Sequence, residues 1–236
     1  MQQLDVIARI RSDFPAKFGI PRQSGLIDAL KSTVVFEPRY RDASALRGLE
    51  GYSHIWLIWQ FSESVMEAWS PTVKPPRLGG NRRMGVFATR SPFRPNPLGL
   101  SCVKLESIEP GTPDGPVLHV AGADLMDGTP IYDIKPYLPY ADCHPEACGG
   151  FTDELAPKLL AVDFPEPLLA RYPESKREAV LEVLRQDPRP GYRRDDGARV
   201  YGVTFAGLDV RFVVEDGVLR VVGVAPPPDG TDKPKR

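Results

Sequence analysis

The chain has 236 residues, of which 42% are hydrophobic and 26% are charged, and its formal net charge is −1. This composition is typical of a folded protein with a buried core, and it excludes disorder throughout the chain. The near-neutral balance also excludes binding of nucleic acid through overall positive charge, so any site for a polyanion must be local.

The cellular location is indicated by what the sequence lacks. Three cysteines are too few for a disulfide framework and fit a reducing compartment. The start, MQQLDVIARIRSDF, has no continuous apolar run like that of a signal peptide, and the apolar run IWLIW is too short to span a bilayer. We therefore expect a cytoplasmic protein with no part in a membrane.

Short strands are predicted for the first part of the chain. The 26 prolines and 21 glycines disfavour long helices. The turn sequence EPGTPDG predicts a hairpin between the last two of the expected strands. Strands at such short spacing predict a closed or nearly closed β-barrel over residues 1–146. The segments with strand-like alternation or β-branched and aromatic content are 4–10, 32–37, 52–61, 84–89, 100–108 and 116–125.

Residues 147–228 are predicted to form a small α+β domain. The segment SKREAVLEVLRQDP predicts a helix, with Ser175 and Glu178 at the spacing of a capping box. Residues 200–224 have the pattern of strands, the last two joined by a turn at Asp216-Gly217. The polar, proline-rich tail, residues 229–236, is predicted to be mobile. The expected fold class is therefore mainly β, a compact barrel followed by a small α+β domain.

Positive charge gathers in one window. No Asp or Glu occurs from Ala68 to Leu105. A charge run of this kind is often no more than a solvated face. Prolines in RSPFRPNP nevertheless stiffen the chain, so that arginines presented there lose less freedom on meeting a phosphate or a carboxylate. The cations inside the window include Lys74, Arg77, Arg82, Arg83, Arg90 and Arg94.

Two further segments are rich in polar groups. In FGIPRQSGL, Arg22 and Gln23 follow Pro21, and they suit either an ordinary polar turn or the recognition of a carboxylate. The segment DLMDGTPIYDIKPYLPYAD combines several aspartates and tyrosines. Asp127 and Gly128 there fit a tight turn, and the carboxylates and phenols fit equally well the lining of a cleft for a polar ligand.

Common catalytic motifs are absent from the sequence. It has no P-loop, no dinucleotide-binding glycine motif and no serine-hydrolase elbow. The run CHPEAC offers Cys143, His144 and Cys148, but it lacks an evident fourth ligand, so no metal site is predicted.

Several longer segments together resemble one family. The runs KFGIPRQSGL, GLEGYSHIWLIWQF, PPRLGGNRRMGVFATRSPFRPNPLGLS and DLMDGTPIYDIKPYLPYAD are similar in order and content to the TsaA/YaeB family, also called TrmO, of bacterial tRNA (adenine(37)-N6)-methyltransferases. The likeness covers the first domain nearly throughout. The runs RPGY and YGVTF of the second domain resemble the extension of the bacterial members.

This resemblance implies a cofactor, a partner and a substrate. It implies a β-barrel that binds S-adenosylmethionine near the interface of a homodimer. It implies methylation of N6 of threonylcarbamoyl-adenosine at position 37, beside the anticodon, in threonine tRNAs. One position departs from the pattern, since many relatives have a histidine where this chain has Ser62. By the resemblance, the cofactor-binding positions are Pro21, Arg22, Gln23, Phe61, Ser62, Arg90, Leu100, Asp127, Gly128, Thr129 and Pro130.

The chemistry of such a reaction suggests roles for these side chains. Arg90 or Arg22 could pair with the cofactor's carboxylate, and Asp127 could face its cationic end. A proton acceptor would help the weakly nucleophilic N6, and the catalytic candidates are Asp133 and Tyr137, with Asp127 as a further possibility. The cations expected to bind the substrate are Lys74, Arg77, Arg82, Arg83, Arg94 and Lys135.

Two other functions are compatible with the residues. A noncatalytic RNA-binding barrel would use the basic window without any cofactor. A methyltransferase of another acceptor would keep the cofactor site and differ only in its substrate.

Overall fold

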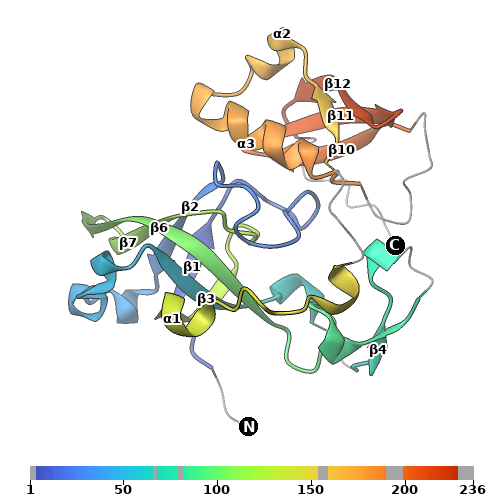
Figure 1. The fold of residues 1–236 in the computed structure, drawn as a ribbon. Helices are drawn as coiled ribbons and strands as arrows, with labels where there is room; N and C mark the ends of the chain where they lie inside the picture. Colours follow the sequence, from blue (N-terminus) through green and yellow to red (C-terminus); the bar gives the residue numbers. More distant parts are fainter. Residues whose placement is uncertain (1–3, 66–67, 79–81, 154–158, 190–198, 228–236) are drawn as a thin grey trace.

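The computed structural model describes residues 4–65, 68–78, 82–153, 159–189 and 199–227. A β-barrel forms the lower part of the molecule in Figure 1, and a smaller sheet with a helix lies above it. The tail predicted to be mobile, residues 229–236, lies outside the described residues. Within the described ranges, no helix is long and apolar enough to cross a membrane.

The barrel is closed by six antiparallel strands, which confirms the predicted fold class. Neighbouring strands follow the order β1-β2-β7-β6-β3-β8. The hairpin expected around EPGTPDG joins β6 to β7. The strands are β1 (Ala8–Arg11), β2 (Lys31–Phe36), β3 (His54–Gln60), β6 (Leu98–Thr112), β7 (Gly115–Ala121) and β8 (Pro130–Pro136).

Alternation along the strands fills the barrel. In β3, Ile55 and Leu57 are fully buried and Trp59 is 6% exposed, whereas the residues between them are only partly buried. This period of two is the pattern expected of a strand with one face on a core. The strand β8, in a segment where only turn signals were recognised, pairs with both β1 and β3 and so completes the closure.

One expected strand is mostly wrong. Of residues 84–89, only β5 (Met84–Gly85) pairs, with β4 (Thr72–Val73), in a short ribbon beside the barrel. Val86–Ala88 form a 3-10 turn instead. The turn is stabilised because both the amide and the hydroxyl of Thr89 donate hydrogen bonds to the carbonyl of Val86, at 3.2 Å and 2.9 Å.

The second part is the predicted small α+β unit. Its sheet has the order β10-β11-β12-β9, in which only β9 runs parallel to its neighbour. The expected turn at Asp216-Gly217 joins β11 to β12. The elements are β9 (Ala161–Asp163), α2 (Glu166–Leu169), α3 (Glu174–Arg185), β10 (Tyr201–Phe205), β11 (Leu208–Glu215) and β12 (Val218–Ala225).

The start of helix α3 differs from the expected capping box. The helix begins at Glu174, and Pro173 occupies the cap position without a side-chain hydrogen bond. Ser175 therefore lies inside the first turn and cannot cap the helix. Pro173 is extended, with a ψ of 145°, so it lies outside the helix, and Glu174 in the first turn interacts favourably with the helix dipole.

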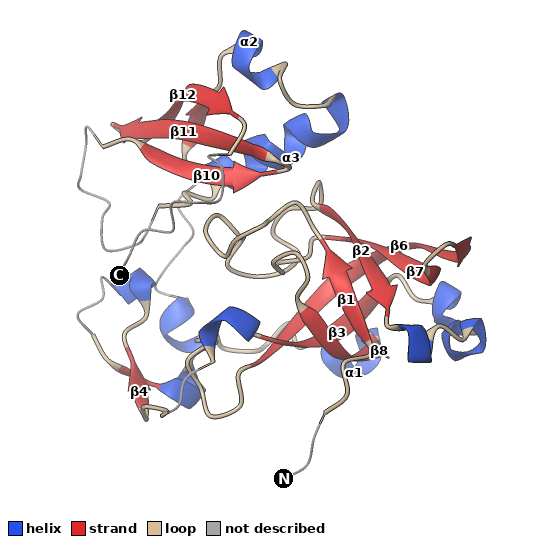
Figure 2. Ribbon diagram, turned by 180° about the vertical axis from the view of Figure 1, so that it is seen from behind, coloured by secondary structure: helices blue, strands red, loops and turns tan. Residues whose placement is uncertain are grey.

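The barrel and the second part have separate hydrophobic cores, and one connection of the barrel belongs to the core of the second part. The connection between β1 and β2, residues 12–30, lies between the barrel and the upper sheet in both views (Figures 1 and 2). Its side chains Phe14, Ile27 and Leu30 are at most 3% exposed and belong to the cluster formed by α3 and the C-terminal sheet. The segment that carries Pro21, Arg22 and Gln23 is therefore packed against the second domain.

Candidate functional site

Two of the segments singled out in the sequence meet at one end of the barrel. Arg90 donates a hydrogen bond from Nη1 to Oε1 of Gln23. The amide group of Gln23 in turn donates to the carbonyl of Arg22. The fold thus brings together the arginine of RSPFRPNP and the turn after Pro21, which are 67 residues apart in the chain.

A polar network lies under Arg90, inside the end of the barrel. The indole Nε1 of Trp59 donates to Oγ of Ser101 at 2.9 Å, and that hydroxyl donates to Oδ1 of Asp124. Burial raises the pKa of Asp124, although hydrogen bonds from Ser101 and the backbone and the charge of Arg90 oppose this effect. The charge of Arg90 therefore acts on this partly buried carboxylate, while its Nη1 binds Gln23. We call Gln23, Arg90, Ser101 and Asp124 the mouth cluster.

Apolar groups border the mouth cluster. The ring of Phe61 packs on Trp59 with 4.3 Å between centroids, and its amide is bonded to the carbonyl of Pro97 at 2.8 Å. Leu100 precedes Ser101 on β6 and points to the outside of the barrel, where it is 56% exposed. Ser62 begins a short 3-10 turn and is exposed. Phe61 is therefore linked to the mouth cluster through Trp59, whereas Leu100 and Ser101 point to opposite faces of β6.

The turn from Asp127 to Pro130 is tied to β1. A carboxylate oxygen of Asp127 accepts a hydrogen bond from the amide of Ser12 at 3.0 Å. The amide of Gly128, which has a φ of +74°, donates to the carbonyl of Ile10 at 2.8 Å. Thr129 and Pro130 are buried at the start of β8. The carboxylate of Asp127 thus holds the backbone where the β1–β2 connection begins, and its role toward a cofactor stays a prediction.

The two catalytic candidates lie on the outer face of the barrel. Asp133 is opposite Ile58 of β3, which is itself opposite Leu100 of β6, so the three side chains form one row. An ion pair of 3.0 Å joins Asp133 to Lys135, and the aspartate side chain is 46% exposed. Asp133 is therefore an accessible carboxylate in line with Leu100.

Tyr137 has a different environment. Its ring packs 5.8 Å from that of Trp56, whose indole donates to Asp142 of α1 (Pro139–Asp142) at 3.0 Å. Burial raises the pKa of Tyr137, and the neighbouring thiol of Cys143 adds to the shift. A phenol with a raised pKa keeps its proton at neutral pH, so Tyr137 is suited to donate a hydrogen bond and Asp133 is the better proton acceptor.

The basic window divides into two groups. Lys74, Arg82 and Arg83 are exposed near the ribbon of β4 and β5, where Arg83 donates to Oγ1 of Thr72 at 2.7 Å. Arg94 is partly buried and donates to the carbonyl of Thr89 at 3.0 Å, so it supports its own loop. The side chain of Arg77 lies outside the described residues.

Two features near the site were missed in the sequence. Trp69 and Phe87 are 53% and 74% exposed with 6.2 Å between ring centroids, and they lie just before and after the ribbon. The alternation of β6 offered a signal for the second feature, because it places the polar Ser101 at an inward position among hydrophobic residues. A buried hydroxyl of this kind needs a partner, and the structure supplies Asp124 and Trp59.

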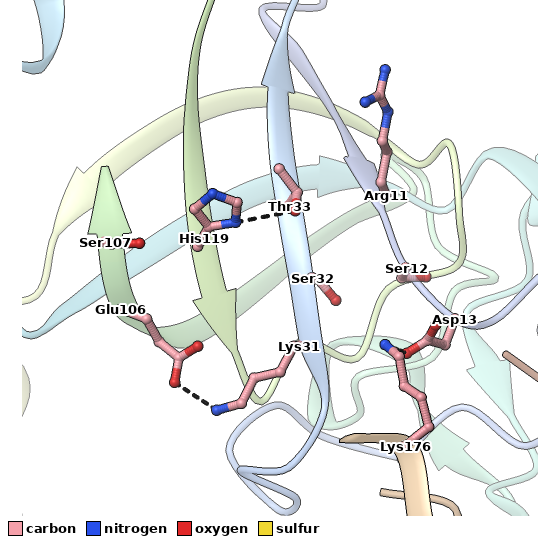
Figure 3. A pocket seen from close by; sticks show the side chains of 10 residues that line it. All are labelled: Arg11, Ser12, Asp13, Lys31, Ser32, Thr33, Glu106, Ser107, His119 and Lys176. Atoms are coloured by element: carbon pink, nitrogen blue, oxygen red, sulfur yellow. Dashed lines mark hydrogen bonds and ion pairs between the residues drawn. The ribbon is translucent and has the colours of Figure 1, made fainter. Parts of the chain in front are cut away.

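A cavity of ≈ 500 Å³ lies elsewhere, between the outside of the barrel and α3 (Figure 3). Its cations face acidic partners, as Lys31 does with Glu106 and Lys176 with Asp13. The charges of the lining therefore largely cancel, which does not favour a site for an isolated anion. The lining residues are Arg11, Ser12, Asp13, Lys31, Ser32, Thr33, Glu106, Ser107, His119 and Lys176.

Comparisons with known proteins agree with the fold. The family model of the tRNA-methyltransferase O N-terminal domain matches residues 9–143, and that of the TrmO C-terminal domain matches residues 157–227. The tRNA (adenine(37)-N6)-methyltransferase of Escherichia coli (strain K12) is 41% identical over 232 residues, which cover 95% of this chain and 98% of the relative.

Two further relatives come from Pseudomonas aeruginosa. A protein named putative S-adenosylmethionine-dependent methyltransferase RcsF is 41% identical over 227 residues, 93% of this chain and 96% of the relative. The crystal structure of TrmO from this organism superposes with a TM-score of 0.76 at 36% identity, and the match covers 96% of this chain and 97% of that one. The resemblance inferred from the sequence is thereby confirmed, and the chain belongs to the tRNA-methyltransferase O family.

Proposed function

We propose that this chain is an S-adenosylmethionine-dependent methyltransferase that modifies N6 of adenosine 37 in tRNA. We further infer that its substrate is the threonylcarbamoyl-modified adenosine of threonine tRNAs. Family membership supports the reaction class. The observation that carries the site is the pairing of Arg90 with Gln23 above the carboxylate of Asp124.

The mouth cluster suits this cofactor. S-adenosylmethionine, when bound, supplies a methyl group activated by a sulfonium. The guanidinium of Arg90 offers a planar pair of donors for the cofactor's carboxylate, and Gln23 offers a donor and an acceptor beside it. The carboxylate of Asp124 matches a cationic group, and the ring of Phe61 suits the uncharged portion, with Leu100 on the outer face of the barrel as a further apolar contact.

The residues of the outer face would act on the acceptor nitrogen. N6 is a weak nucleophile, so most of the rate must come from holding it in line with the methyl group at near-attack distance. N6 loses a proton during methylation, and Asp133 is an accessible carboxylate that could receive it. Lys135 orients this carboxylate through the 3.0 Å ion pair.

A surface for the tRNA lies around the ribbon of β4 and β5. Lys74, Arg82 and Arg83 are exposed there and match the phosphates of an anticodon loop. The exposed rings of Trp69 and Phe87 offer planar surfaces on which unpaired bases can stack. We also propose a cytoplasmic homodimer with the cofactor near its interface, a role for which the exposed Leu98 and Leu100 are suited.

Labelled S-adenosylmethionine tests this proposal. The purified chain is incubated with threonine tRNA that carries the threonylcarbamoyl group and with the same tRNA made without it. Label found only in the modified tRNA supports the full proposal. Equal label in both supports a methyltransferase with another acceptor, and binding of tRNA without any incorporation supports a noncatalytic RNA-binding barrel.

A further inference from the structure

The β1–β2 connection packs into the hydrophobic core of the C-terminal domain. Phe14 lies 5.2 Å, centroid to centroid, from Phe205 of β10, and both rings are at most 1% exposed. Ile27 and Leu30 complete the same hydrophobic cluster, and Ile20 packs against it. The apolar side chains of this connection are therefore buried against the second domain rather than inside the barrel.

Polar contacts fix the same segment. The amide of Ala206, in the turn after β10, donates to the carbonyl of Asp13 at 2.9 Å. The ammonium of Lys176 reaches from α3 to the carboxylate of Asp13, as the positions in Figure 3 show. The side chains of this ion pair are only 27% and 18% exposed, so it is less screened by solvent than a surface pair.

The turn that leads to Gln23 lies directly on the second domain. Gly19 has a φ of +89°, and a Cβ added there would be 2.2 Å from Cγ2 of Val203. Pro21 is buried. A small cavity of ≈ 60 Å³ is lined on one side by residues 19–22 and on the other by Val183 and residues 186–189.

The opposite side of the connection faces the mouth cluster. Gln23 accepts the hydrogen bond of Arg90. Two residues later, the amide of Gly25 donates to the carbonyl of Gly122 at 2.9 Å, and the amide of Gly122 donates to the carbonyl of Leu30 at 2.9 Å. The connection is thus supported by the second domain on one side while it presents Gln23 to Arg90 on the other.

We propose that the C-terminal domain is a positioning element of the cofactor site, in which Val203 and Phe205 act through the β1–β2 connection on Gln23 and Arg90. This inference rests on the proposed function, which places S-adenosylmethionine at those two residues. Ordering a loop during binding opposes affinity through lost chain entropy. A loop already ordered by the second domain avoids that loss, so the domain raises cofactor affinity without touching the cofactor.

Matched truncations in the full chain test the inference. Val203 and Val221 are 1% and 2% exposed in the same cluster, but Val221 lies on β12, two strands away from β10 in the sheet. Val203→Ala is expected to raise the Kd of S-adenosylmethionine about tenfold in titration calorimetry. At saturating cofactor its methyl-transfer rate stays near that of the wild type. Val221→Ala loses comparable stability and keeps the wild-type Kd.

A second pair of variants separates positioning from loss of folding. Gly19→Ala introduces the contact with Val203, so it should weaken cofactor binding more than Val203→Ala does. The double variant should bind more tightly than Gly19→Ala, because removing Cγ2 leaves Val203 Cβ at 3.5 Å, an ordinary contact. Gly217→Ala is the control for backbone strain, since its φ is +77° and no atom lies within 4 Å of the added Cβ.

The outcomes distinguish two failures. A wild-type chain that takes up no S-adenosylmethionine contradicts the proposed function itself. A wild-type chain that binds it, together with folded Val203→Ala and Gly19→Ala variants of unchanged Kd, overturns the inference about the second domain.

Discussion

Arg90 and Gln23 are joined by a hydrogen bond between the guanidinium and the side-chain oxygen, at the end of the barrel where Asp124 is partly buried. The glutamine belongs to a connection packed on the second domain, and the arginine belongs to a proline-rich loop. Two loops that are far apart in the sequence thus form one polar site at the end of the barrel. Binding and catalytic residues commonly lie on loops that a rigid scaffold positions in this way.

Replacing Arg90 tests the cofactor site. Arg90 is exposed, so Arg90→Ala should leave the unfolding transition nearly unchanged. It removes the proposed partner of the cofactor's carboxylate, so we expect S-adenosylmethionine binding to fall at least tenfold in calorimetry. Arg47→Ala, an exposed arginine after β2, is the control and should bind like the wild type. An unchanged affinity for S-adenosylmethionine in the Arg90 variant would show that the cofactor binds elsewhere.

Ionisation of Asp124 should change the pH dependence of the free energy of unfolding. Burial raises its pKa in the folded chain above the ordinary 3.8. At a pH between 3.8 and this raised pKa, the folded chain holds a proton that the unfolded chain releases. The free energy of unfolding therefore falls as the pH rises through this range. Asn cannot ionise. The stability of Asp124→Asn relative to the wild type, measured by urea unfolding, should therefore increase with pH above 3.8. Its affinity for the cofactor should fall, because the variant removes the carboxylate near Arg90.

Asp142 provides a control of opposite sign. Hydrogen bonds from the amide of Leu138 and from Trp56 lower its pKa. The wild type should therefore gain stability relative to Asp142→Asn as the pH rises toward 3.8, and lose it as the pH falls. A stability difference that is flat with pH for Asp124→Asn would show that Asp124 is not buried as described.

Gly99 should tolerate no side chain. An added Cβ would lie 2.3 Å from Cε2 of Trp59, whose indole is bonded to Ser101 inside the barrel. Gly99→Ala should therefore displace this tryptophan and destabilise the chain by about 3 kcal/mol. Chemical denaturation measures the loss. Gly85→Ala meets no atom within 4 Å and should stay within about 0.5 kcal/mol of the wild type; equal stability of the two variants would contradict the packing.

The basic ribbon should carry tRNA affinity. Removing Arg82 and Arg83 together is expected to weaken tRNA binding and to reduce its dependence on salt, because fewer counterions are released. The Kd for S-adenosylmethionine should not change. Filter binding across a range of salt concentrations measures both effects. The double variant Arg39→Ala with Arg47→Ala removes the same charge from another surface, and a salt slope lowered equally in both variants would move the RNA site elsewhere.

The barrel could be predicted from local patterns. Alternation in β3 and β6 and the turn before β7 depend on neighbouring residues, so the sequence shows them directly. Residues 84–89 were mistaken for a strand because the hydrogen bonds of Thr89 to Val86, rather than side-chain pattern, decide their conformation. The closure by β8 was missed because turn residues and prolines dominate that segment.

The site could be predicted only in part. The resemblance named Arg90 and Gln23, but their contact depends on two loops meeting across 67 residues. Asp124 stood among several aspartates, and nothing local shows that its carboxylate is buried and bonded to Ser101. The packing of Phe14 into the C-terminal core was also hidden, because a phenylalanine in a short connection gives no sign of the domain that covers it.

Methyl transfer to a tRNA altered at one position tests the central claim most directly. The chain is given labelled S-adenosylmethionine and either threonine tRNA purified with its threonylcarbamoyl-adenosine at position 37 or the same tRNA with guanosine there. The proposed function predicts label in the first tRNA, recovered as an N6-methylated adenosine, and none in the second. Label in both tRNAs, or in neither, would contradict it.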